Sequence, residues 1–198
     1  DDGSMKIDEA QLPDILPVLA LRNVALFPGS IFPITIGREK SVKLVKEAEK
    51  KEFFIGTIPQ YDATVEDPSE TDLYRYGTIA RVLKTLDMPD GNMTAIVQSV
   101  RRIEMVALLG SDPYLTARVR YRPEIVPDSV GNDIIALMES IKEKAVTVIK
   151  NANVGWREGI NALRSIDNLT FLVNFVATTI ETDDFRQKME LLQYDDVR

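Results

Sequence analysis

The chain of 198 residues contains no cysteine and no histidine. Without cysteine it has no disulfide framework, no thiol nucleophile and no thiolate metal site. Without histidine it lacks the commonest general base and the commonest metal ligand of proteins. Catalysis by carboxylates or by a Ser-Lys pair remains open, but the common catalytic arrangements that use cysteine or histidine are excluded.

The sequence also lacks phosphate-binding glycine patterns, since neither G-x-x-x-x-G-K-[S/T] nor G-x-G-x-x-G occurs among its 10 glycines. No apolar run approaches the roughly 20 residues that a membrane-spanning helix needs. The acidic start at Asp1 and Asp2 differs from the basic start of a signal peptide. We therefore expect a cytoplasmic protein with no cofactor and no metal in this segment.

Excess positive charge is missing as well, because the net charge is −7. Nucleic-acid binding depends on a basic field, so a nucleic-acid partner is not expected. Arg118, Arg120 and Arg122 form one local basic stripe. Their alternate spacing is most simply the solvated face of a strand.

The sequence changes character between Pro123 and Pro127. Before this point apolar and polar residues alternate between turns, whereas after it apolar residues recur at helical spacing. We expect a β-rich domain over 12–124 and a helical subdomain over 125–198. Residues 1–11 are set aside as a tag or disordered start, because Gly3-Ser4 before Met5 resembles a cloning remnant.

Short alternating runs predict the strands of the first domain. They lie at Val18–Arg22, Phe53–Ile58, Thr78–Leu86, Met93–Val100, Arg102–Leu108 and Tyr114–Tyr121. Pro89-Asp90-Gly91-Asn92 predicts a tight hairpin, because Asp-Gly supplies positive φ angles. Successive short strands with such turns indicate an antiparallel sheet or a partly closed barrel.

One helix is predicted within this domain, over Arg38–Lys51, where apolar residues recur at three- and four-residue steps. It should lie across the sheet and close one end of the barrel. The segment Pro59–Tyr76 holds several acidic residues without a periodic pattern and is predicted to be a long surface loop.

The second part predicts a series of helices. The first carries the apolar stripe from Ile134 to Val148, and the second contains Trp156. Asn168 is the expected cap of a third, Thr182 of a fourth and Asp195 of a fifth. The third helix is apolar on so many sides that it should be the centre of a bundle.

Several motifs carry a resemblance to a known family. They are Leu16-Pro-Val-Leu-Ala-Leu-Arg-Asn-Val-Ala-Leu-Phe-Pro-Gly29, Gly37-Arg-Glu-Lys-Ser41, Asp72-Leu-Tyr-Arg-Tyr-Gly-Thr-Ile-Ala-Arg81 and Leu86-Asp-Met-Pro-Asp-Gly91. In this order they strongly resemble the amino-terminal region of the Lon ATP-dependent proteases. The resemblance runs from about Leu12 to Arg198. It departs from the family pattern at Ala20, where proline is commoner, and at Asn23, where aspartate is commoner.

The resemblance implies an α+β fold, with an amino-terminal antiparallel sheet or partly closed barrel and one packed helix, followed by an all-α helical bundle. It implies a parent that is a homo-oligomeric, hexameric ring protease acting in protein quality control. In such a parent an AAA+ module binds ATP and Mg, and a Ser-Lys dyad cleaves peptides. Both modules would lie outside this non-catalytic segment.

The implied partners are unfolded or damaged proteins, specific regulatory proteins and other copies of the chain, with no membrane contact. A receptor for unfolded chains should present an apolar patch with charges around it. A first set of candidate contacts is Phe27, Ile31, Phe32, Arg38, Glu39 and Lys40. A second set is Tyr61, Leu73, Tyr74 and Tyr76.

Simpler explanations compete with each candidate. The aromatic rings of the first set can be core residues beside a turn, and Arg38, Glu39 and Lys40 can be an ordinary solvated helix start. Leu73 and Tyr74 can anchor their loop to the sheet. Three other functions also stay open: an assembly module, a standalone protein with only the sheet domain, and an enzyme that uses carboxylates or a Ser-Lys pair.

Overall fold

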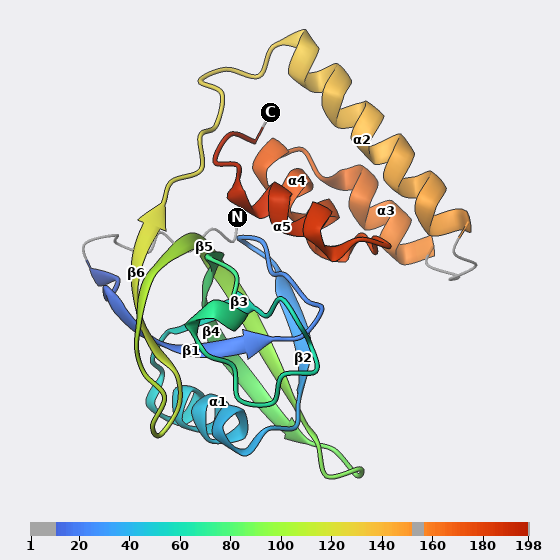
Figure 1. Ribbon diagram of the computed structural model, residues 1–198. Helices are drawn as coiled ribbons and strands as arrows, with labels where there is room; N and C mark the ends of the chain where they lie inside the picture. The colour runs from blue at the N-terminus through green and yellow to red at the C-terminus, as the bar shows by residue number, and fades with distance from the viewer. Residues whose placement is uncertain (1–10, 152–156, 198) are drawn as a thin grey trace.

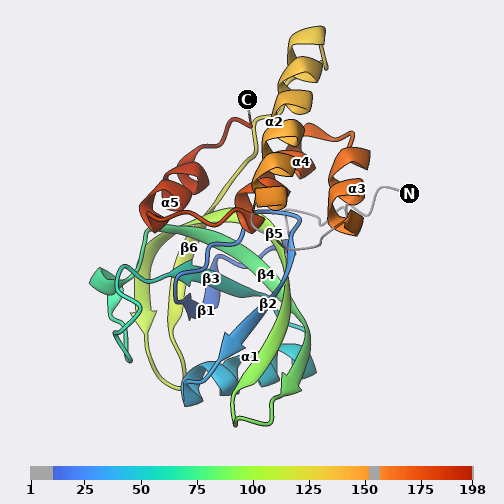
Figure 2. The same cartoon turned by 90° about the vertical axis from the view of Figure 1, so that its right-hand side faces the viewer.

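The structure, a computed structural model, describes residues 11–151 and 157–197. A β-sheet forms the body of the molecule, with helix α1 at one end and helices α2 to α5 at the other (Figure 1). Figure 2 shows the same separation after a quarter turn. Most of the predicted start segment, residues 1–10, and Trp156 of the predicted second helix lie outside the described residues.

Six strands make up the sheet: β1 (Ile15–Leu21), β2 (Ile31–Ile36), β3 (Ile55–Pro59), β4 (Tyr76–Asp87), β5 (Met93–Gly110) and β6 (Thr116–Arg122). Their order is β2-β5-β4-β3-β1-β6, and β5 also pairs with β6. Strands β1, β3, β4, β5 and β6 therefore close a ring of hydrogen bonds, which we call the strand ring. Strand β2 is added to it at β5.

The sheet is mixed, whereas the sequence predicted an antiparallel sheet or a partly closed barrel. Strand β1 runs parallel to β3, with Val18 opposite Gly56, and antiparallel to β6. Parallel neighbours need a crossover connection. Strand β2 and the helix α1 (Glu39–Lys51) together form that connection.

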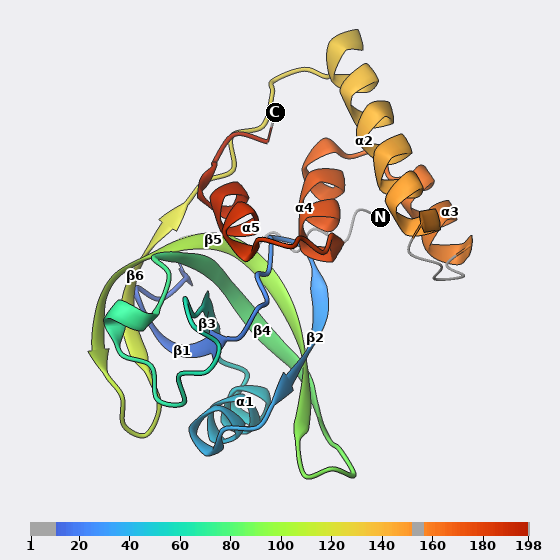
Figure 3. The ribbon, with the colours of Figure 1, turned by 45° about the vertical axis from the view of Figure 1, so that its right-hand side comes forward.

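Two details of the strand prediction were wrong. Met93–Val100 and Arg102–Leu108 were expected as separate strands, but both belong to the single strand β5. Strand β2 was not expected at all, because Pro33 interrupts its apolar run. The hairpin between β4 and β5 is confirmed, and Gly91 has the required positive φ of 86°. Figure 3 shows this hairpin projecting beyond α1.

Helix α1 packs against the sheet through Leu44, Val45 and Ala48, which are buried. They join a core cluster with apolar residues of β1 to β5, among them Leu19 and Ile55. The polar positions of the helix face solvent, as its predicted amphipathic pattern requires.

In the described residues, four helices form the second part: α2 (Asn132–Asn151), α3 (Arg157–Ser165), α4 (Leu169–Thr179) and α5 (Phe185–Gln193). Asn168 caps α4 as predicted, since its side chain accepts a hydrogen bond from the N–H of Phe171 at 2.9 Å. The prediction for α5 was wrong by two residues, because Asp184 and not Thr182 is its cap.

The helices contact the sheet at what we call the junction. Phe27, from the connection between β1 and β2, is buried there with Ala177 of α4 and Met189 of α5. The buried Arg102 of β5 forms an ion pair with Glu124 and donates a hydrogen bond to Oδ1 of Asn174 in α4 at 3.2 Å. Apolar packing and one buried charged network therefore join the two parts.

The chain leaves the sheet and returns to it at one place. Ile125 donates a backbone hydrogen bond to the carbonyl of Asp195 at 2.7 Å, and Val197 donates one to Ile125 at 3.2 Å. The carboxylate of Asp195 also accepts hydrogen bonds from Nε and Nη2 of Arg122. The prediction that Asp195 caps a further helix was therefore wrong.

Candidate functional site

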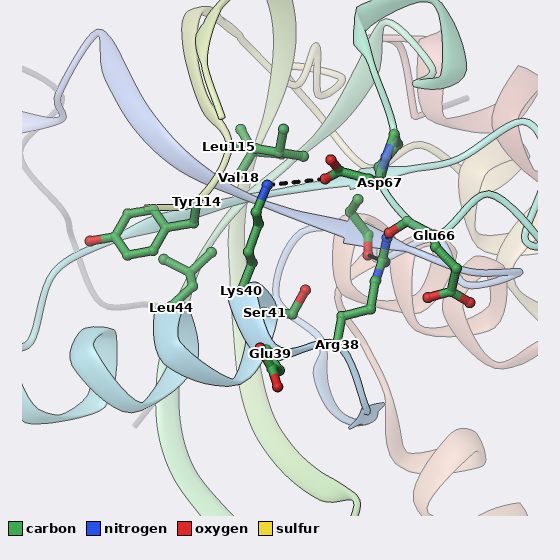
Figure 4. Close-up of a pocket in the computed structure, with 12 residues that line it drawn as sticks. Val18, Arg38, Glu39, Lys40, Ser41, Leu44, Glu66, Asp67, Tyr114 and Leu115 are labelled. Atoms are coloured by element: carbon green, nitrogen blue, oxygen red, sulfur yellow. Dashed lines mark hydrogen bonds and ion pairs between the residues drawn. The ribbon is translucent and has the colours of Figure 1, made fainter. Parts of the chain in front are cut away.

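The predicted charged residues Arg38, Glu39 and Lys40 line a pocket of about 260 Å³ at the start of α1 (Figure 4). Residues from β1, from α1 itself, from the loop between β3 and β4, and from the turn before β6 complete it. They are Val18, Ala20, Ser41, Leu44, Glu66, Asp67, Pro68, Tyr114 and Leu115. The volume lies just below the roughly 300 Å³ of the smallest common ligand pockets, so it suits one or two side chains.

Arg38 holds the pocket together from the residue before α1. Its Nη2 donates a hydrogen bond to the carbonyl of Ala20 in β1 at 2.7 Å, and its Nη1 donates one to the carbonyl of Glu66 at 3.3 Å. Burial lowers the pKa of Arg38, with a smaller lowering effect from Arg22. The guanidinium thus links a strand edge to the loop across the pocket.

Exposed ion pairs form the rim. Nζ of Lys40 lies 3.2 Å from Oδ1 of Asp67, and Nη2 of Arg22 lies 3.0 Å from Oε1 of Glu66. Such exposed pairs contribute at most about 1 kcal/mol each. The rim can therefore rearrange at low cost in free energy, whereas the apolar floor is part of the core.

The floor consists of apolar side chains, chiefly Val18, Leu44 and Leu115, which are all buried. The hydroxyl of Tyr114 donates a hydrogen bond to Oε2 of Glu47 at 3.4 Å, and both burial and Glu47 raise the pKa of Tyr114. This arrangement has charged groups around an apolar floor. It is suited to hold side chains of a partner.

A second hollow of about 250 Å³ lies beside the first, between the end of β1 and the strand β2. The two hollows share Ala20, Arg38 and Ser41. Hollows therefore lie on both sides of Arg38, next to the second half of β1.

Two other kinds of site are absent from the described residues. No helix in residues 11–151 and 157–197 is long and apolar enough to cross a bilayer. Over that same part of the chain, no group of three or more acidic side chains is placed to hold a metal ion.

A family model described as the ATP-dependent protease La (LON) substrate-binding domain matches residues 15–198. The chain belongs to this family. It is similar to the Lon proteases of Flavobacterium johnsoniae, at 37% identity over 187 residues, and Porphyromonas gingivalis, at 35% over 195 residues. The matches cover 94% and 98% of this chain but only 23% of each relative, so the chain spans about a quarter of their length.

Solved structures share the fold of this Lon domain. The N-terminal domain of Lon protease from the Mycobacterium avium complex matches with a TM-score of 0.71 and 22% identity, covering 92% of this chain and 91% of that one. The Lon N-terminal domain protein of Xanthomonas campestris matches with a TM-score of 0.63 and 18% identity, covering 93% and 92%. The mixed sheet followed by helices is thus a Lon N-terminal fold.

The other predicted contacts of the Lon domain do not join the pocket. Phe27, Leu73 and Tyr74 are buried, so their side chains are core residues in this conformation. Phe32 is half-buried against the core beneath α1, whereas Ile31 is 59% exposed near the junction.

The second predicted set forms an aromatic cluster beside α5. The ring of Tyr61, which is 62% exposed, lies 4.0 Å from that of Tyr74 between centroids, and Tyr74 in turn contacts Phe185. The half-buried Tyr76 lies 5.3 Å below the guanidinium of Arg122. These residues anchor the loop to the sheet and helix, and only Tyr61 offers a broad exposed face.

The sequence interpretation missed the acidic half of the pocket and its floor. Glu66 and Asp67 were noted only as acids of a loop, although their charge complements Arg38 and Lys40. That complementarity is the one signal that could have found them. Leu115 carried no such signal, because it belongs to an ordinary strand pattern.

Proposed function

We propose that the chain is the non-catalytic substrate-engaging part of an ATP-dependent Lon serine protease. The family match over residues 15–198 is the observation that carries this proposal. Support comes from the pocket, where charges surround an apolar floor able to hold side chains that a folded protein buries. In this proposal the ATPase module, with its ATP and Mg, and the Ser-Lys dyad lie in the rest of a cytoplasmic parent.

Binding of an unfolded protein to the isotope-labelled 198-residue chain tests this proposal. We expect a permanently denatured model protein to move amide resonances around the pocket, especially those of Lys40, Asp67 and Leu115. The same protein in its folded state is the control and should leave these resonances in place. If no resonance in residues 12–122 moves at millimolar concentration, the chain does not engage unfolded substrates.

A second proposal is that the helical subdomain, 125–198, helps to assemble copies of the parent into a ring. Exposed apolar residues on α2 favour it: Ile135 is 50% exposed, Leu137 39% and Val148 49%. Analytical ultracentrifugation of the parent with Leu137→Lys measures this role. A change toward smaller species supports assembly through α2, and an unchanged ring speaks against it. Assembly alone, without substrate binding, is the alternative that the resonance experiment separates.

A further inference from the structure

Strand β1 pairs with β6 over its first half and with β3 over its second half. Strand β3 pairs with residues 18–21 on one side, but β6 pairs only with residues 15–17 on the other. The last hydrogen bond toward the β6 side runs from the N–H of Val18 to the carbonyl of Leu115, at 2.8 Å. Strand β6 begins at Thr116, so no strand residue stands opposite Ala20 on this side.

The backbone of Ala20 points into this open edge. Peptide groups of successive strand residues point to opposite sides of the strand. The carbonyl of Leu21 accepts a hydrogen bond from the N–H of Gln60 on the β3 side, so the carbonyl of Ala20 points the other way. There it accepts a hydrogen bond from Nη2 of Arg38.

Arg38 bridges two backbone carbonyls across this edge, that of Ala20 and that of Glu66. In a sheet, a strand that lies between two others donates backbone N–H groups to the carbonyls of both. The guanidinium occupies the same position and offers its own N–H groups instead. It therefore stands in for a strand in a slot between β1 and the loop.

We propose that this slot takes an extended segment of a substrate polypeptide, which pairs antiparallel with β1 in line with β6 and displaces the guanidinium of Arg38. The inference rests on the proposed function and specifies its substrate class. Pairing between backbones gives affinity that depends little on sequence, while a pocket for one side chain adds a preference. Here the pocket floor of Val18, Leu44 and Leu115 would hold an apolar side chain.

The surroundings of the slot suit this exchange. The displaced guanidinium stays beside the carboxylates of Glu66 and Asp67, which already favour its charged form. The exposed pair between Lys40 and Asp67 can open without loss of core packing. The free edge of β2 is a poorer choice, because Pro33 has no N–H to donate.

The test uses the 198-residue chain and a soluble peptide of about ten residues, longer than an ordinary strand. The peptide is rich in serine and threonine, with one central phenylalanine to fix its position at the pocket. Two further versions carry N-methyl groups on alternate residues, one version for each of the two alternating sets. Dissociation constants are measured by fluorescence titration, and amide exchange of Ala20 is followed by NMR.

We expect one methylated version to bind more weakly than the unmethylated peptide, by about tenfold for each hydrogen bond lost. The other version should bind within about twofold of the unmethylated peptide. The amide of Ala20 should gain protection from exchange. Arg38→Ala should tighten binding about three- to tenfold, because no guanidinium competes for the carbonyl. Arg118→Ala, which alters an exposed arginine of β6 away from the slot, should change nothing.

Three outcomes would count against the inference. They differ in whether they also contradict the proposed function. If both methylated versions bind as well as the unmethylated peptide, side chains alone are recognised and strand addition is wrong, while substrate engagement stands. If Arg38→Ala weakens binding, the guanidinium is a direct contact and is not displaced. If no version binds and denatured protein also fails to bind, the proposed function and this inference fall together.

Discussion

Removing the carboxylate of Glu124 should destabilise the junction more than the loss of an exposed ion pair would. Glu124 pairs with Arg102 and accepts a hydrogen bond from Nδ2 of Asn174 at 2.7 Å. The side chain of Arg102 is only 5% exposed, and its Nε has no hydrogen-bond partner in the described structure. In Glu124→Ala the guanidinium would remain buried without a counter-charge.

The structure sets the magnitude of this effect. Removing one partner of a buried ion pair costs about 3–5 kcal/mol in general. Glu124 is itself 20% exposed, and Asn174 still accepts a hydrogen bond from Arg102, so we expect about 2–3 kcal/mol here. Glu66→Ala is the matched control, because it removes a carboxylate that is 76% exposed and should cost less than about 1 kcal/mol.

The assay is urea unfolding of the 198-residue chain followed by circular dichroism, with amide exchange at Phe27 as a local readout. The N–H of Phe27 donates to Oγ1 of Thr178 across the junction, at 3.3 Å, so its exchange should accelerate in Glu124→Ala. Adding Arg102→Met to Glu124→Ala should recover about half of the lost stability, because the unpaired charge is gone. Equal free energies of unfolding for Glu124→Ala and Glu66→Ala would refute this reasoning.

Three further predictions concern single residues. A Cβ on Gly77 would lie 2.1 Å from the backbone carbonyl oxygen of Thr57, so Gly77→Ala should lower the urea midpoint sharply or prevent folding, whereas Gly110→Ala should not. Burial and a neighbouring carboxylate raise the pKa of Tyr121 from 10.0 to about 12. The stabilisation linked to this phenol is present below pH 10 and is lost as the pH rises through 12, so stability should fall less over this range in Tyr121→Phe, measured by unfolding across pH. Asn168→Ala removes the cap of α4 and should cost about 1 kcal/mol in urea unfolding, and a cost near zero would contradict the role of that cap.

Elements with local signals were predictable from the sequence. Helix α1 follows from its own apolar spacing, and the β4–β5 hairpin follows from Asp90-Gly91. The unbroken strand β5 did not follow, because Arg101 and Arg102 interrupt its alternating pattern. The reason that Arg102 is tolerated inside lies 22 and 72 residues away, at Glu124 and Asn174.

The candidate site shows the same limit. The charged start of α1 was identified because glycine and charge mark it in one short segment. The floor of the pocket was not, since Val18 and Leu115 meet only when β1 pairs with the β6 segment. Asp195 illustrates the opposite error: it has the residue type and spacing of a helix cap, yet its carboxylate binds Arg122, 73 residues away.

The contact between Ile125 and Val197 has a mechanical consequence. A pull on the backbone at Val197 would pass through two backbone hydrogen bonds and the Arg122–Asp195 pair directly into β6, so tension would bypass α2 to α5. The four helices form a side loop outside the line of force, and they would stay folded until that contact breaks. Once it breaks, the helical segment would lie in the line of force between Val197 and the strand ring.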